Sequence, residues 1–217
     1  MKKFNYMTLA VAVCALVLIL PPAQYALALS DAYKGNVYQT GPLKPTDSRL
    51  KVKVGEKAPG FTLPAISGGM VSLADYYGKK NVVLSFVPAA WTPVCSDQWP
   101  GYNIIKDLFD EHDATLLGIT VDSIPTLFSW TNQMGKLWFP VLSDFWPHGQ
   151  VAEKFGILRT DGTSERALFV IDKKGIIRYI DVHDINERPP LENLVKALEK
   201  LKQEPLFRGK KVDTGGY

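Results

Sequence analysis

NVVLSFVPAAWTPVCSDQWPGY, residues 81–102, combines an expected buried strand with an expected helix start. Its first half is an apolar run rich in valine, which is typical of a buried strand, and the run stops at Pro88. A helix is predicted to follow, with Thr92 as the N-cap and Pro93 in the first helical position. Cys95 then falls in the first helical turn, where unpaired backbone N–H groups and the helix dipole favour a negatively charged sulfur.

The segments on either side of this stretch alternate between expected strands and expected helices. A hairpin is predicted around Ser67-Gly68-Gly69, and Pro189-Pro190 is predicted to start the last helix, in which leucines recur at helical spacing. The other predicted elements are strands at 115–121, 140–142, 167–171 and 176–182, and helices at 124–135 and 149–155. This order predicts an α/β fold with a mixed central sheet flanked by helices and an N-terminal hairpin.

The spacing of Pro88, Thr92 and Cys95, Pro-x-x-x-Thr-x-x-Cys, resembles the active-site loop of the peroxiredoxins, the AhpC/TSA family. The phrase FPVLSDFWPHG, residues 139–149, is most similar to the one-cysteine alkyl hydroperoxide reductase E type. The resemblance covers about residues 54–201. It implies a thioredoxin-like fold and a thiol-dependent peroxidase that reduces hydrogen peroxide or organic hydroperoxides.

The resemblance also implies a role for each residue of the motif. Cys95 attacks the peroxide and becomes a sulfenic acid, Thr92 holds the bound peroxide, and Pro88 shields the thiolate from water. The arginine of the family corresponds to Arg166, just before an expected strand. Trp91, inside the loop, is a candidate for lining the peroxide entrance.

Several competing interpretations concern the same residues. Cys95 could be a buried structural thiol, and capping alone would explain Thr92. Three other arginines could take the role assigned to Arg166, namely Arg159, Arg178 and Arg188. Of these, Arg178 is expected to face solvent. A non-catalytic thioredoxin-like protein also stays open, whereas a disulfide oxidoreductase would need a second cysteine in place of Gln98. Gln98 also departs from the family, because many peroxiredoxins carry a glutamate there, and this leaves the network around the arginine undefined.

Metal and nucleic-acid binding are not expected. The chain has three histidines, of which His148 is expected to lie in a loop, and there is no second cysteine near Cys95 to complete a metal site. No cofactor is expected either. The 25 basic residues nearly balance the 22 acidic ones, so the charge does not indicate a nucleic-acid partner. The expected partners are a peroxide, an external thiol reductant and a second copy in a homodimer. The reductant is expected to be thioredoxin-like, glutaredoxin-like or a low-molecular-weight thiol.

The first 28 residues have the order of a secretory signal peptide. Lys2 and Lys3 precede an apolar stretch at 7–20, and Ala26-Leu27-Ala28 is a small-x-small cleavage site. The protein is therefore expected to be exported to the periplasm or the exterior, with a membrane anchor as the alternative. Residues 29–53 are predicted to form an extended arm, 54–205 the domain and 206–217 a tail. Removal of residues 1–28 would leave Cys95 as the only cysteine.

Overall fold

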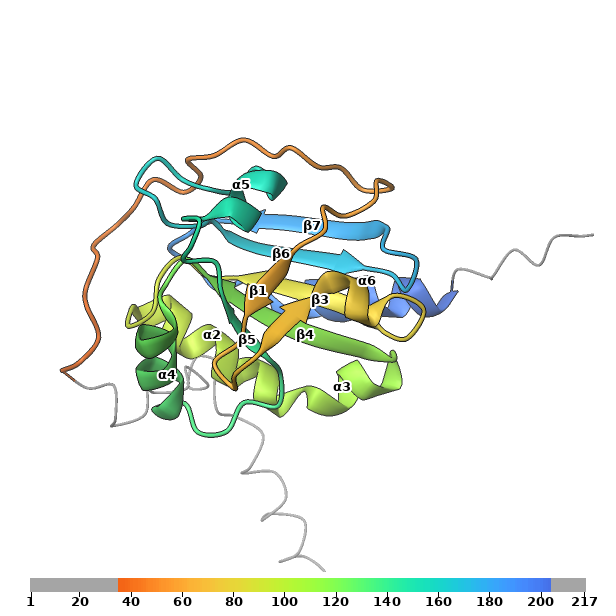
Figure 1. The fold of residues 1–217 in the computed structure, drawn as a ribbon, viewed down its shortest axis with the longest axis horizontal. Coiled ribbons are helices and arrows are strands. Elements are labelled where there is room, and N and C mark those ends of the chain that lie inside the picture. Colours follow the sequence, from red (N-terminus) through yellow and green to blue (C-terminus); the bar gives the residue numbers. More distant parts are fainter. Residues whose placement is uncertain (1–34, 204–217) are drawn as a thin grey trace, which may run out of the picture.

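A five-stranded mixed sheet forms the centre of the computed structural model, which describes residues 35–203 (Figure 1). Its order is β5-β4-β3-β6-β7, with the bounds Val141–Ser143, Ala114–Thr120, Asn81–Phe86, Arg166–Ile171 and Ile177–His183. β3 and β4 pair in parallel, as do β4 and β5, whereas β6 is antiparallel to both β3 and β7. The predicted mixed sheet is confirmed, and the strand of residues 81–102 lies at its centre.

Both faces of the central strands are buried. In β6, Ala167 and Phe169 belong to one hydrophobic core cluster, and Leu168 and Val170 belong to the cluster on the opposite face. Successive side chains of a strand point to opposite faces, so a strand that is covered on both sides needs an unbroken apolar sequence. This is the physical reason why the apolar runs predicted strands here.

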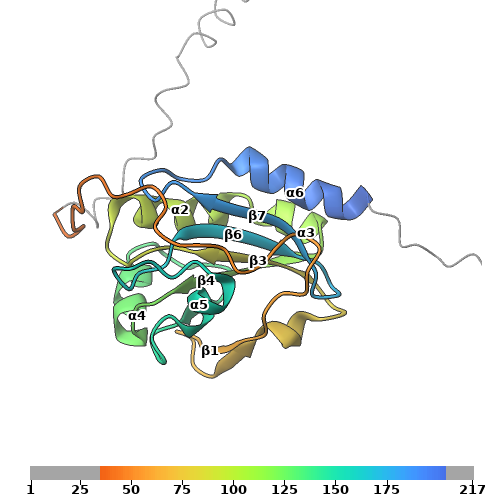
Figure 2. The ribbon, with the colours of Figure 1, turned by 90° about the horizontal axis from the view of Figure 1, so that it is seen from above.

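Helices cover the two faces unequally (Figure 2). The face that carries Leu168 packs against residues of α2, α3, α4 and α6, which span Pro93–Ile104, Lys106–Glu111, Ile124–Asn132 and Leu191–Gln203. The opposite face packs against α5 (Gln150–Phe155), the 3-10 helix η3 (Leu73–Tyr76) and the hairpin of β1 (Thr62–Pro64) and β2 (Met70–Ser72). The predicted hairpin and the four predicted helices are all present, and the helices predicted over 124–135 and 149–155 are shorter than expected.

Two helical features differ from the sequence prediction. The helix predicted over 124–135 ends at Asn132, and α3 was not predicted. α3 has six residues and buries only Phe109, so its sequence carries no helical periodicity. α2 continues through Pro100 and is separated from α3 at Ile105.

Residues 35–53, the described part of the predicted arm, run over the surface without a helix or strand (Figure 1). The Lys51 N–H donates to the Phe155 carbonyl at 3.1 Å, and Val52 is buried. Gly156 permits this approach, because its φ is +76° and an added Cβ would lie 2.3 Å from the Arg49 carbonyl oxygen. The expected leader at 1–28 and tail at 206–217 lie outside the described residues. No helix within residues 35–203 is long and apolar enough to cross a membrane.

Candidate active site

Cys95 occupies the third position of α2, as predicted. Thr92 is the N-cap residue with extended backbone angles, and its carbonyl accepts the first intrahelical hydrogen bond, from Ser96 N–H at 3.0 Å. The N–H groups of Val94 and Cys95 precede that bond, so they have no intrahelical acceptor. The cysteine is 1% exposed and lines a pocket. Its sulfur is therefore held at the positive end of a helix, within reach of a small molecule.

The side chain of Thr92 does not cap the helix, which corrects the capping role expected from the sequence. Its hydroxyl instead donates to the Ala89 carbonyl at 2.9 Å, back across the loop that precedes α2. The adjacent Ala90 N–H donates to the Asp122 carboxylate at 2.8 Å, which fixes the same loop. A hydroxyl that donates its proton in this way still has acceptor capacity, and Thr92 lines the pocket beside Cys95.

Arg166, at the start of β6, reaches the sulfur from the other side. Its Nη2 lies 3.5 Å from Cys95 Sγ, although the two residues are 71 positions apart. Nη1 donates to Gln98 Oε1 at 2.6 Å, and Nε and Nη2 donate to the Ile185 carbonyl at 3.2 and 3.0 Å. The guanidinium is 2% exposed and is held by four hydrogen bonds. Its hydrogen-bond partners other than the sulfur are neutral groups.

The three competing arginines each pair with a carboxylate. The pairs are Arg159 with Glu165 at 2.6 Å, Arg178 with Asp172 at 2.8 Å and Arg188 with Asp97 at 2.8 Å. Arg178 was expected to face solvent, but its side chain is only 30% exposed because it packs beside Asp172. The structure thus brings Arg166, and not its competitors, into contact with Cys95.

Gln98 connects Arg166 to a buried polar network. Its amide accepts from Arg166 and donates to Tyr102 Oη at 3.1 Å and to Ser85 Oγ at 3.4 Å. Trp99 Nε1 donates to the same Ser85 hydroxyl at 3.2 Å. Burial raises the pKa of Tyr102 to about 12, so the phenol stays neutral. A glutamine suits this position because it accepts on one side and donates on the other, which an ionised glutamate cannot do.

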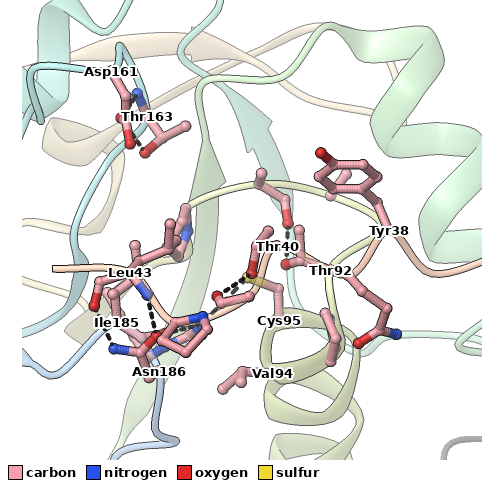
Figure 3. Close-up of a pocket in the computed structure, with 18 residues that line it drawn as sticks. Tyr38, Thr40, Leu43, Thr92, Val94, Cys95, Asp161, Thr163, Ile185 and Asn186 are labelled. Atoms are coloured by element: carbon pink, nitrogen blue, oxygen red, sulfur yellow. Dashed lines mark hydrogen bonds between the residues drawn. The ribbon is translucent and has the colours of Figure 1, made fainter. Parts of the chain in front are cut away.

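The four residues singled out from the motif, Pro88, Thr92, Cys95 and Arg166, all line one pocket of about 820 Å³ (Figure 3). Most of the remaining lining is apolar. The arm contributes residues 38–43, a contribution that sequence reasoning missed because the arm has no periodicity that would place it. Asp161, Thr163 and Asn186 also line the pocket and were not predicted.

Two other candidates have no part in this pocket. Trp91 lies outside its lining, which corrects the expected entrance role; the indole is partly buried against the core cluster that contains Trp99. The Trp91 backbone has a positive φ of 60°, and its carbonyl accepts from the Tyr38 N–H at 2.7 Å. His148 lies in a loop, with Nε2 2.7 Å from the Gly162 carbonyl oxygen.

Comparisons with known proteins agree with this geometry. Residues 54–180 match the model of the AhpC/TSA family. An alkyl hydroperoxide reductase E from Mycobacterium tuberculosis is 38% identical over 137 residues, which cover 63% of this chain and 89% of the relative. A chloroplastic 2-cysteine peroxiredoxin from Chattonella marina var. antiqua is 31% identical, covering 70% and 82%.

A solved structure of a reduced 2-Cys peroxiredoxin from Plasmodium vivax superposes with a TM-score of 0.66 at 28% identity, over 70% of this chain and 82% of that one. The AhpC structure from Mycobacterium tuberculosis, at 22% identity, has a TM-score of 0.65 over 71% of this chain and 96% of its own. These neighbours confirm the predicted thioredoxin-like fold. The family match and the two sequence relatives do not favour the non-catalytic alternative.

Proposed function

Because the chain belongs to the AhpC/TSA family and is a thiol-dependent peroxidase, we propose that Cys95 is its peroxidatic residue and that Thr92, Pro88 and Arg166 assist it. The contact that carries this proposal is the 3.5 Å approach of Arg166 Nη2 to Cys95 Sγ. It occurs in a pocket that is large enough for a substrate. A peroxide is the substrate and a thiol is the reductant, as in the rest of the family.

The reaction is a two-electron displacement at oxygen. The Cys95 thiolate, favoured by the N-terminus of α2 and by Arg166, attacks the terminal peroxide oxygen. An S–O bond forms while the O–O bond breaks, and the electron pair leaves with the second oxygen. Cys95 becomes a sulfenic acid, and the leaving hydroxide or alkoxide takes up a proton as water or an alcohol. Arg166 stabilises the charge that develops on this leaving oxygen.

Thr92 and Pro88 prepare the peroxide for attack. Because the Thr92 hydroxyl donates to the Ala89 carbonyl, its oxygen is directed to accept a hydrogen bond from the peroxide O–H. Pro88 has no backbone N–H, and its ring adds an apolar surface to the pocket. An apolar surface beside the sulfur keeps water from competing for the thiolate.

Reduction of the sulfenic acid requires a thiol from outside the chain. Cys95 is the only cysteine after residue 28, so the mature chain contains no second thiol for an internal disulfide. The reductant is a thioredoxin-like protein, a glutaredoxin-like protein or a low-molecular-weight thiol.

A homodimer is part of this proposal, and exposed Phe145 and Trp146 supply apolar surface for it. Sedimentation velocity would detect the dimer.

The proposed location is the periplasm or the exterior, after cleavage behind Ala28. Its support is the order of Lys2 and Lys3, the apolar stretch and the Ala-x-Ala site. Intact-mass measurement of the native protein tests this, since an uncleaved N-terminus in the membrane fraction would favour the anchored alternative.

The proposal is tested by replacing the two central residues. Cys95→Ser is expected to abolish peroxide consumption while the circular dichroism spectrum stays native, and residual activity with a thiol donor would overturn the assignment.

Arg166→Ala is expected to slow the peroxide step by about 100- to 1,000-fold, because a donor to the developing charge is lost. The rate is measured at a pH high enough to ionise the thiol, with Arg178→Ala as the matched control. Equal rates for the two arginine variants would remove Arg166 from the site.

A further inference from the structure

Residues 38–43 of the arm form one wall of the active-site pocket, here called the arm wall. All six residues line the pocket, which has eighteen lining residues in total. In Figure 3 the arm wall passes from Tyr38, on the Thr92 side of the pocket, to Leu43, on the side of Ile185 and Asn186. One wall of the site is thus built by a segment that precedes the residues matched by the family model.

Hydrogen bonds fix the arm wall at both ends. At one end the Tyr38 N–H donates to the Trp91 carbonyl at 2.7 Å. At the other end the Asn186 side chain binds both backbone polar groups of Leu43: it accepts from the N–H at 2.8 Å and donates to the carbonyl at 2.9 Å. Two bonds to one residue hold it as a neighbouring strand would. The arm wall therefore has a defined position relative to Cys95.

The pocket is much larger than the peroxide group requires. Its volume is about 820 Å³, whereas a water molecule occupies about 30 Å³ in the liquid, so two peroxide oxygens fill only a small part. The remaining space is lined mainly by apolar residues, namely Pro42, Leu43, Ala89, Ala90, Val94 and Ile185. Size and lining suit an apolar organic group.

We propose that the arm wall, chiefly through Leu43, determines peroxide specificity by holding the organic group of an apolar hydroperoxide while the peroxide oxygens lie at Cys95. Leu43 is half-buried and is positioned by Asn186, whereas Tyr38 is 73% exposed. This inference rests on the proposed role of Cys95. It adds a binding contribution that hydrogen peroxide, which has no organic group, cannot use.

The test compares two peroxides in single-turnover experiments without reductant. Sulfenic acid on Cys95 is trapped with dimedone and counted by intact mass, with cumene hydroperoxide or hydrogen peroxide as oxidant. For Leu43→Ala, the ratio of the cumene hydroperoxide rate constant to the hydrogen peroxide rate constant is expected to fall about tenfold, as for the loss of a few apolar carbons from a binding pocket. Leu50→Ala is the matched control, since Leu50 lies in the same arm, outside the pocket lining. Its ratio is expected to stay that of the wild type.

Asn186→Ala provides a second variant that leaves the pocket's apolar lining intact. It releases the Leu43 backbone and is expected to lower the same ratio. A wild-type ratio in both variants would overturn the inference. A wild-type protein that forms no sulfenic acid with either peroxide would instead overturn the proposed role of Cys95.

Discussion

Two buried arginines seven residues apart have opposite surroundings. Arg159 is 5% exposed and pairs with the fully buried Glu165, and its Nη2 donates to the Lys44 carbonyl of the arm at 3.0 Å. Arg166 is 2% exposed, and its hydrogen bonds go to Gln98, to the Ile185 carbonyl and to the Cys95 sulfur. The first arginine is neutralised by a carboxylate, whereas the second is solvated by neutral dipoles.

The difference shows that the partner of a buried charge decides its role. A buried cation must be compensated, and Glu165 compensates Arg159. The pair also attaches the arm, because Arg159 donates to the Lys44 carbonyl and Glu165 accepts from the Asp47 N–H. Neutral partners leave the charge of Arg166 available to the Cys95 sulfur, which lies 3.5 Å from its Nη2. In the proposed mechanism this contact lets the arginine stabilise the thiolate and the thiolate stabilise the arginine.

Removal of Arg159 is expected to produce the largest effect on folding. Arg159→Ala leaves the Glu165 charge buried without its cation, so the free energy of unfolding should fall by about 3–5 kcal/mol. Urea unfolding measures it. The control is the double variant Arg159→Met with Glu165→Gln, which removes both charges and keeps an acceptor for the Asp47 N–H. The double variant should recover most of the free energy of unfolding that Arg159→Ala loses. Equal losses in the single and the double variant would contradict the interpretation that the two charges compensate each other.

An intermediate effect on the free energy of unfolding is expected at alkaline pH. It comes from Tyr102, which belongs to the neutral hydrogen-bond network behind Arg166. Burial raises the pKa of Tyr102 from 10.0 to about 12, so the unfolded chain releases this proton first as the pH rises. The contribution of Tyr102 to stability is complete below pH 10.0 and is lost as the pH rises towards about 12, by roughly 2–3 kcal/mol.

Tyr102→Phe should therefore lose less stability than the wild type across this pH window. Urea unfolding of both proteins at several alkaline pH values checks the expectation. Parallel declines would mean that Tyr102 is not the group that titrates.

The smallest expected effect is on the rate of the peroxide step, and it comes from giving Arg166 a carboxylate partner like that of Arg159. Gln98→Glu places a carboxylate against Nη1, where the amide oxygen now lies at 2.6 Å. This carboxylate competes with the sulfur for the positive charge, and the peroxide step should slow by about tenfold, ~1.4 kcal/mol. Stopped-flow oxidation of Cys95 measures the rate, and Gln98→Met separates the loss of an acceptor from the gain of a charge. A glutamate variant as fast as the wild type would show that the charge of the partner does not distinguish the two arginines.

Local signals in the sequence were sufficient to predict the central strand, the start of α2 and the position of Cys95 in its first turn. The buried apolar run, the Thr-Pro pair and the spacing to the cysteine act over a few residues, so one sequence contains all of them. The choice of Arg166 over Arg159 required the resemblance to a family, because neither residue is marked by local periodicity: Arg159 lies in the loop before β6 and Arg166 is the first residue of β6.

Interactions over long sequence separations explain what could not be predicted. The Thr92 hydroxyl turned away from the helix because the loop presents the Ala89 carbonyl, a tertiary arrangement that is partly set by Asp122. The arm wall depends on Asn186, 143 residues after Leu43. No pattern along the chain records that such distant residues meet.

The alternation of β6 also limits which changes in chain length the protein can tolerate. Glu165 and Arg166 are consecutive, yet one binds Arg159 and the arm while the other points to Cys95, since neighbouring side chains leave a strand on opposite faces. Insertion or deletion of a single residue at the entry to β6 reverses this parity: a carboxylate would replace the guanidinium beside the sulfur, or the core side chains of β6 would exchange faces. A two-residue change in chain length at this boundary would preserve the parity that a one-residue change destroys.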